Sequence, residues 1–261
     1  MLQPRDRLIV ALDVPGAFQA RQIVQTIGEA AVTYKVGKQL FTAEGPQVVR
    51  DLISSGRKVF LDLKFHDIPH TVAAAVKSAA DLGVSMMTVH ASGGSKMLKA
   101  AAEAASQSPA KIPRSGPATA GVEMVAGPTI LAVTVLTSLT DSDLQESGIC
   151  GNVLSQVLRL GALARNAGCG GLVASAQEAG ELRRELGEDF AIVTPGIRPA
   201  GTAPGDQARV VTPKDAITAG ATHLVVGRPI LDAPDPAYAA AKIVQEIAAA
   251  LSSYAQHVAT R

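Results

Sequence analysis

Residues 59–65, with the sequence VFLDLKF, are apolar apart from one aspartate and one lysine. A nearly continuous apolar run of this length is typical of a strand covered on both faces in a parallel sheet. Similar runs recur, and the first four begin at residues 8, 33, 59 and 86, so they lie 25, 26 and 27 residues apart. The predicted strands are 8–13, 33–37, 59–65, 86–90, 130–137, 171–175, 191–197 and 223–228. Their spacing predicts a repeated unit of one strand and one helix.

Eight β/α units within 261 residues predict an α/β fold, a TIM (β/α)8 barrel that forms a single domain over residues 1–261. A doubly wound open sheet is the alternative, but residues 11–16 read ALDVPG and lack the G-x-G-x-x-G turn typical of that fold. The segment 106–128 is rich in Pro, Gly, Ser and Ala, and we expect an irregular surface excursion there. A linker between two domains is disfavoured, because four strands on either side would not close a barrel.

The charge composition argues against nucleic acid and acidic membranes as partners. Lys and Arg number 24 and Asp and Glu 23, which gives a net charge of +1, and the basic residues are spread along the chain. No apolar run at the start has signal-peptide length, and the longest uncharged stretch, 124–140, contains Gly, Pro, Thr and Ser. The two cysteines, Cys150 and Cys169, have no metal-like spacing and give little support to a disulfide. These features predict a soluble cytoplasmic protein.

Charged residues gather at the predicted C-terminal ends of the first three strands, where barrels of this type carry catalytic groups. Asp13 ends the first run, Lys35 lies in the second, and Asp62 and Lys64 lie in the third. Because side chains alternate along a strand, Asp62 and Lys64 are expected to face the barrel interior together. Asp67 follows in the loop. A catalytic role is favoured, since burying charges costs several kcal/mol per ion and a fold rarely needs it.

Other interpretations of this cluster remain open. The charges could form a structural ion-pair network, or the aspartates could ligate Mg²⁺, which prefers oxygen ligands. The two lysines disfavour the metal, because an ammonium group already supplies positive charge beside the carboxylates. His66 and His70 are four residues apart, but Pro69 disfavours a helical metal pair, so we expect a loop and a helix start there. His90 fits either a pocket wall or a hydrogen-bonded core position.

A second group of residues follows the last two predicted strands. Pro195, Gly196 and Arg198 follow the seventh strand, and Gly227 and Arg228 follow the eighth. In TIM barrels the loops after these strands commonly bind phosphate through backbone N–H groups at a helix start. Glycine permits close approach of the backbone, and arginine offers a fork of donors to a phosphate dianion. The sequence therefore predicts a phosphate site.

The pattern Asp62-x-Lys64-x-x-Asp67-Ile68-x-x-Thr71 resembles the signature of the orotidine 5′-phosphate decarboxylase family. The resemblance extends over most of the chain: Leu12-Asp13, Lys35-Val36-Gly37, residues 134–138, Pro195-Gly196-Ile197-Arg198, Asp206-Gln207 and Gly227-Arg228. It implies decarboxylation of orotidylate to UMP without a metal or an organic cofactor. It also implies a homodimer of TIM barrels with active sites at the subunit interface.

The resemblance assigns roles to the charged cluster. Lys64 would donate the proton to C6 of the pyrimidine, and Asp62 would lie against the departing carboxylate. Lys35 and Asp13 would hold the ribose hydroxyls and the charge network. Asp67 would reach into the site of the partner subunit.

The resemblance also implies a set of substrate-binding residues outside that cluster. Thr71 would lie near the subunit junction, and Thr137 would contact the amide edge of the pyrimidine, with the neighbouring Ser138 as the alternative. Gln207 would link base and phosphate. The residues expected around the phosphate are Pro195, Arg198, Gly227 and Arg228.

Two rival functions remain. Mg²⁺-dependent sugar-phosphate decarboxylases and hexulose-phosphate synthases of the same superfamily share the Asp-x-Lys-x-x-Asp run, but carry a metal-binding glutamate in strand two where this chain has Lys35. A positive group at that place would repel the ion. The other rival, from a different class, is a non-catalytic protein that binds nucleotide phosphates.

Overall fold

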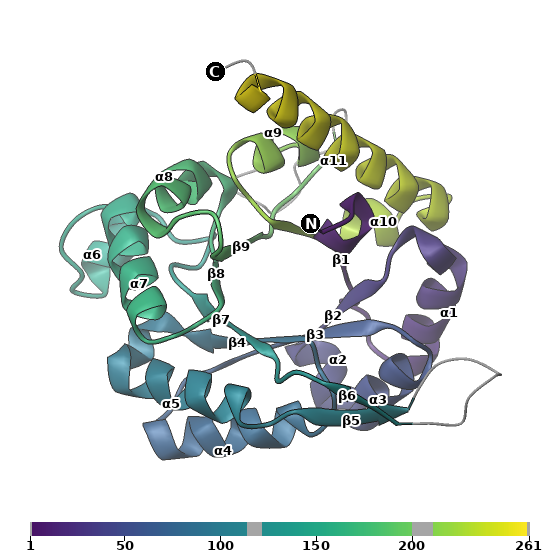
Figure 1. Ribbon diagram of the computed structural model, residues 1–261, viewed down its shortest axis with the longest axis horizontal. Helices are drawn as coiled ribbons and strands as arrows, with labels where there is room; N and C mark the ends of the chain where they lie inside the picture. Colours follow the sequence, from purple (N-terminus) through teal and green to yellow (C-terminus); the bar gives the residue numbers. More distant parts are fainter. Residues whose placement is uncertain (1, 114–121, 200–210, 260–261) are drawn as a thin grey trace.

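The computed structural model describes residues 2–113, 122–199 and 211–259, and eight of its strands close into a parallel barrel (Figure 1). The order around the barrel is β1-β10-β9-β8-β7-β4-β3-β2. The barrel strands are β1 (Leu8–Ala11), β2 (Thr33–Gly37), β3 (Lys58–Phe65), β4 (Met86–His90), β7 (Thr129–Val133), β8 (Gly171–Val173), β9 (Ala191–Thr194) and β10 (His223–Val226). This closed barrel confirms the predicted fold class.

Helices surround the barrel as an outer layer (Figure 1). They are η1 (Pro4–Arg7), α1 (Ala17–Ile27), η2 (Gly28–Ala30), α2 (Lys38–Glu44), α3 (Gln47–Ser54), α4 (Pro69–Ala80), η3 (Ala91–Gly93), α5 (Gly94–Ser106), α6 (Asp141–Glu146), α7 (Val153–Asn166), α8 (Ala176–Leu186), α9 (Pro213–Thr218), α10 (Arg228–Leu231) and α11 (Pro236–Ala259). Side-chain oxygens of Thr140, Asn152, Ser175 and Thr212 cap four of them by accepting from a backbone N–H of the first turn. Within the described ranges, no helix combines the length and the apolar character needed to span a bilayer.

The strands separate two apolar layers. Outward-facing side chains such as Leu8, Tyr34 and Leu224 pack against the helices in one large cluster. The alternating inward-facing side chains form a second cluster inside the barrel: Ile9, Ala11, Phe60, Leu131, Val193 and Val225. These six side chains form an apolar plug, and the polar residues Lys35, Asp62 and Thr88 also lie within the barrel strands, in β2, β3 and β4.

The predicted and observed strands differ mainly at their C-terminal ends. The predicted ranges 33–37 and 86–90 match β2 and β4, but several of the other ranges run past the observed C-terminal ends. Pairing of β7 ends at Val133 and that of β9 at Thr194, because the chain leaves the barrel there. Asp13 likewise lies two residues beyond the last residue of β1. Of the residues predicted for substrate binding, Asp13, Thr137, Pro195, Arg198 and Gly227 thus lie beyond the strands. Thr71 lies in α4, and Arg228 begins α10.

The prediction of an irregular segment over 106–128 is wrong for 110–113 and 122–125, and residues 114–121 lie outside the described residues. Two antiparallel strands, β5 (Ala110–Pro113) and β6 (Val122–Val125), form a separate sheet between α5 and β7. Ala110 pairs with Val125 and Pro113 with Val122. A hairpin satisfies the backbone N–H and C=O groups of both arms, which an irregular excursion would leave to water.

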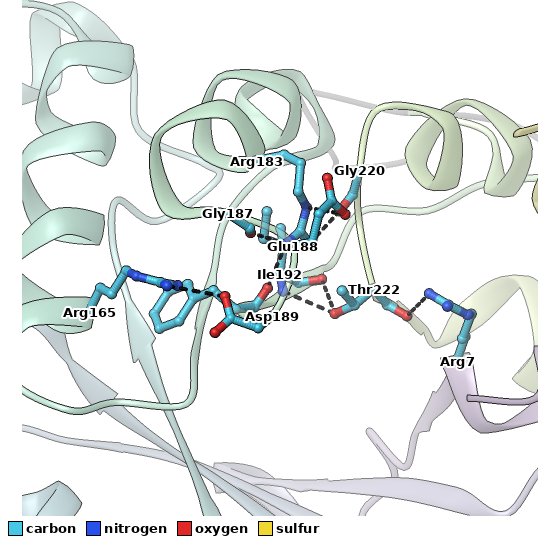
Figure 2. A network of polar contacts seen from close by, with 10 residues as sticks. Arg7, Arg165, Arg183, Gly187, Glu188, Asp189, Ile192, Gly220 and Thr222 are labelled. Atoms are coloured by element: carbon cyan, nitrogen blue, oxygen red, sulfur yellow. Dashed lines mark hydrogen bonds and ion pairs between the residues drawn. The ribbon is translucent and has the colours of Figure 1, made fainter. Parts of the chain in front are cut away.

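Polar side chains tie together the loops at the N-terminal end of the barrel (Figure 2). Arg183 donates to three backbone carbonyls, those of Gly187 at 2.6 Å, Phe190 at 2.9 Å and Gly220 at 2.9 Å. Arg7 donates to the carbonyl of Thr222 at 3.2 Å. The hydroxyl of Thr222 bonds the backbone N and O of Ile192, both at 3.0 Å. This network joins the segments that lead into β1, β9 and β10.

His223 lies at this end of the barrel, and we expect it to make the stability of the fold depend on pH. Burial, with the Arg7 charge as the second cause, lowers the pKa of His223 from 6.5 to about 4. Between these two values the unfolded chain binds a proton that the folded chain does not, so the free energy of unfolding falls as the pH drops through this window. We expect a loss of about 2 kcal/mol between neutral pH and about pH 5, measured by urea unfolding.

A matched pair of variants checks the source of this loss. His223→Gln removes the titrating group and should flatten the dependence on pH. The exposed His70 offers the control, because His70→Gln should keep the wild-type slope. An unchanged slope in His223→Gln would show that other groups cause the acid sensitivity.

Candidate active site

The C-terminal half of β3 departs from regular pairing. Leu61 pairs with Met87 and Phe65 pairs with Val89, so three residues of β3 lie opposite a single residue of β4. Lys64 has a φ of 55° and is the one non-glycine residue with positive φ in the described ranges. Holding a residue in this region costs about 1–3 kcal/mol and is common at functional sites.

The ammonium of Lys64 lies against the carboxylate of Asp62. Lys64 Nζ is 2.8 Å from both Asp62 Oδ1 and Asp62 Oδ2. The Lys64 side chain is 24% exposed and the Asp62 side chain 12%. The pair is therefore largely withdrawn from water, while the lysine remains accessible to a small molecule.

A second ion pair continues the network. Lys35 Nζ is 2.8 Å from Asp13 Oδ1 and 3.9 Å from Asp62 Oδ2. The alternating order Asp13, Lys35, Asp62, Lys64 balances two negative against two positive charges. Gly37 gives this pair room, because a Cβ there would lie 2.9 Å from Lys35 Nζ and 3.3 Å from Asp13 Oδ1. Burying Lys35, Asp62 and Lys64 is tolerable because the charges of the cluster alternate and hydrogen-bond one another, while the Asp13 side chain is 56% exposed.

The network adjoins a pocket of about 620 Å³ at the mouth of the barrel. Asp13 and Lys35 line the pocket, and so do the residues predicted for phosphate binding: Pro195, Gly196, Arg198, Gly227 and Arg228. Asp13 and Lys35 of the charged cluster thus share one cavity with the predicted phosphate residues, whereas Asp62 and Lys64 are not among its lining residues. This cavity has the size of a small-ligand site.

Positive charge is concentrated on one side of this pocket. Arg198 is buried, and burial together with the neighbouring Arg228 lowers its pKa, with Asp232 opposing them. Arg228 begins α10, directly after Gly227. Two neighbouring guanidinium groups are suited to an anion of charge −2, which relieves their repulsion.

The structure places the other predicted residues outside this pocket or leaves them undescribed. Asp67 is exposed, and its Oδ1 accepts a bond from the backbone N of Ile68 at 2.6 Å. Thr71 is exposed on α4. Thr137 is half-buried and Ser138 exposed, both in the loop after β7. Gln207 lies outside the described residues.

Two residues of β4 belong to the site. The sequence analysis did not name Thr88, and it left the role of His90 open. Thr88 hydrogen-bonds the β3 residues Asp62 and Lys64. His90 lies with its ring 5.4 Å from that of His66. Burial lowers the pKa of His90, with further lowering from His66 and Lys64. The sequence contained a signal for these two residues, because the alternation of side chains along a strand places residues 86, 88 and 90 on one face.

Within the described ranges, the histidines and acids do not converge on a metal position. His66 lies in the loop after β3 and His70 in the first turn of α4, as expected from Pro69. Among the residues that the structure describes, no group of three or more His, Cys, Asp or Glu side chains is placed to hold an ion.

Comparison with known proteins agrees with this geometry. The sequence profile of the Orotidine 5′-phosphate decarboxylase / HUMPS family matches residues 6–243. The chain is 48% identical over 243 residues to an orotidine 5′-phosphate decarboxylase of Nitrosococcus oceani, covering 93% of this chain and 98% of the relative. It is 49% identical to the enzyme of Alkalilimnicola ehrlichii, with 93% and 97% covered.

Solved structures give the same result. The crystal structure of orotidine 5′-phosphate decarboxylase from Lactobacillus acidophilus superposes with a TM-score of 0.78 at 39% identity, covering 93% of this chain and 99% of that one. The enzyme from Pyrococcus horikoshii superposes with a TM-score of 0.70 at 25% identity, covering 92% and 98%. The pocket and the paired lysines and aspartates agree with these matches. The chain therefore belongs to the orotidine 5′-phosphate decarboxylase family.

Proposed function

We propose that this protein decarboxylates orotidine 5′-phosphate to UMP and CO₂, the decarboxylation of pyrimidine nucleotide biosynthesis. The observation that carries the proposal is the Lys64 ammonium, held 2.8 Å from both oxygens of Asp62. Asp62 lies 3.9 Å from Lys35, which lines the pocket together with two arginines. In this proposal the two arginines bind the phosphate of the substrate. The Lys64 ammonium protonates the carbon that loses CO₂. The names of the relatives support the same activity.

The chemistry follows from the charges. When the bond between C6 and the carboxylate breaks, its electron pair stays on C6 in an sp² orbital that the ring delocalises poorly. The fixed ammonium of Lys64 stabilises this negative charge and then transfers its proton to C6. The electrostatic effect is large because the apolar plug below the cluster keeps water and its screening away. Lys64 regains a proton from solvent after product release.

The remaining residues bind the nucleotide in this proposal. Arg198, Arg228, Gly227 and Pro195 hold the phosphate, and Lys35 with Asp13 holds the ribose hydroxyls. Thr137 contacts the pyrimidine and Gln207 joins base to phosphate. Asp62 lies against the substrate carboxylate. Binding energy from the remote phosphate is available to lower the barrier at C6.

We further propose that the protein acts as a homodimer in the cytoplasm. Asp67 forms no ion pair with any residue in the described ranges, although its family motif joins it to Asp62 and Lys64. Together with Thr71 on α4, it would complete the site of the partner subunit. The neighbouring Ile68 is 65% exposed, an apolar side chain suited to a subunit contact.

The Mg²⁺-dependent chemistry of sugar-phosphate relatives is the second candidate, because the matching profile covers both groups. The buried Lys35 argues against it. Its ammonium lies 2.8 Å from Asp13 and 3.9 Å from Asp62, where a cation ligated by these carboxylates would have to lie. The lysine therefore supplies the positive charge that a metal ion would otherwise bring.

A spectrophotometric assay tests the proposal. Orotidine 5′-phosphate is incubated with protein that has been dialysed against EDTA, and the loss of its ultraviolet absorbance is followed. We expect full turnover in the presence of the chelator. Activity that appears only on adding Mg²⁺ would favour the sugar-phosphate reaction, and binding of UMP without turnover would identify a non-catalytic binding protein.

A further inference from the structure

Thr88 is a fully buried polar residue in the middle of β4, beside the irregular part of β3. Its exposed fraction is 0%. It lies between Met87 and Val89, the two residues that pair with Leu61 and Phe65. Thr88 therefore faces the bulge, where the regular ladder of backbone hydrogen bonds between β3 and β4 is interrupted.

The hydroxyl of Thr88 makes two hydrogen bonds across this gap. Its Oγ1 accepts from the backbone N of Lys64 at 2.9 Å and donates to Asp62 Oδ1 at 2.9 Å. One hydroxyl thus uses its donor and an acceptor lone pair on the two residues of the ion pair. The carboxylate oxygen that receives this bond also lies 2.8 Å from Lys64 Nζ.

These bonds restrain two groups that otherwise have freedom to move. Lys64 holds its positive φ of 55° against a steric preference, and the bond to its N–H gives that conformation a buried partner. The Asp62 carboxylate could rotate, and the bond from Thr88 fixes the oxygen that orients the ammonium. The Thr88 hydroxyl is therefore linked to Lys64 twice, directly at its backbone N and through Asp62 Oδ1 at its Nζ.

We propose that Thr88 is a positioning residue for the decarboxylation, one that aims the Lys64 ammonium at C6 without touching the substrate. The inference rests on the proposed function, because the reaction defines what the ammonium must reach. Misplacing a reacting group by about 1 Å costs about 10²-fold in rate. The binding of the phosphate by Arg198 and Arg228 does not depend on Thr88.

The test compares three variants. Thr88→Val keeps the shape and removes the hydroxyl, while Thr88→Ser keeps the hydroxyl. Thr222→Val is the matched control, because the Thr222 hydroxyl also bridges buried backbone groups but lies at the N-terminal end of the barrel. The measurements are kcat, the dissociation constant of UMP, the melting temperature and the exchange of the C6 hydrogen of UMP in D₂O.

We expect Thr88→Val to lower kcat and the C6 exchange rate about 100-fold, with the affinity for UMP changed less than about threefold. Thr88→Ser should restore kcat to within about fivefold of wild type. Thr222→Val should lower the melting temperature without lowering kcat. This pattern separates aiming of the lysine from general loss of stability.

Other results would overturn the inference. A folded Thr88→Val enzyme with kcat within threefold of wild type would do so, as would equal losses of kcat in Thr88→Ser and Thr88→Val. If Thr88→Val does not fold, Thr88→Cys, with its weaker donor, is judged by the same criteria, and an unchanged kcat there overturns the role of the hydroxyl. Wild-type protein without turnover would instead refute the proposed function.

Discussion

Replacing Lys64 with alanine is expected to lower kcat for orotidine 5′-phosphate by about 10⁵-fold or more. The change removes a general acid, which contributes about 10²–10⁴-fold. It also removes the charge that stabilises the carbanion, an effect of about 10²–10³-fold for a single group. Turnover at high enzyme concentration, followed by the ultraviolet absorbance of the substrate, measures the residual rate.

The same strand offers the control for this variant. Lys58 begins β3 at the other end of the barrel, and its side chain is 60% exposed. Lys58→Ala should keep kcat within about twofold of wild type, since exposed surface substitutions have small effects. Lys64→Ala should still bind UMP through the arginines. If Lys64→Ala retained a tenth or more of the wild-type rate, another group would have to protonate C6.

Mixing Lys64→Ala subunits with Asp67→Ala subunits is expected to restore activity that neither variant has alone. If Asp67 completes the partner's site, each mixed dimer has one site with both substitutions and one with neither. Random exchange makes half of the dimers mixed, so about one quarter of the wild-type activity should return. The assay follows kcat after partial unfolding and refolding of the two variants together.

Subunit exchange must be verified independently, with one variant carrying an affinity tag and the mixed dimer isolated. As a control, Lys64→Ala mixed with the double variant Lys64→Ala/Asp67→Ala should stay inactive. Verified exchange without recovery would show that Asp67 serves the site of its own subunit. A monomeric protein with full activity would contradict the dimer as well.

The sequence predicted the barrel well because its signals are repetitive. Each strand is a short apolar run, and the ranges 33–37 and 86–90 match the structure. The C-terminal ends of the strands were less predictable. The β10 strand stops at Val226 although the predicted range ran to residue 228, because Gly227 and the helix that begins at Arg228 redirect the chain. Apolar composition reports burial, and some residues just beyond a strand, such as Leu12, Val135 and Ala174, are also buried.

The placement of Asp62 and Lys64 on one face could be predicted from the alternation of side chains along a strand. The bulge in β3 opposite Thr88 could not be predicted in this way. A regular strand also places these side chains on one face, so nothing in the local pattern demands a positive φ at Lys64. That conformation depends on the partner strand, where Thr88 supplies a hydrogen bond from 24 residues away in the chain. The hairpin of β5 and β6 was missed for a similar reason, since each arm is too short to be recognised without its partner.

The arginine network at the N-terminal end and the ion pairs at the opposite end divide the barrel into two regions that protein engineering can address separately. Substitutions around Arg183 and Arg7 act on resistance to heat and urea. Substitutions around the pocket mouth act on which nucleotide is accepted. Libraries confined to one region can therefore be screened for one property while the other is held constant.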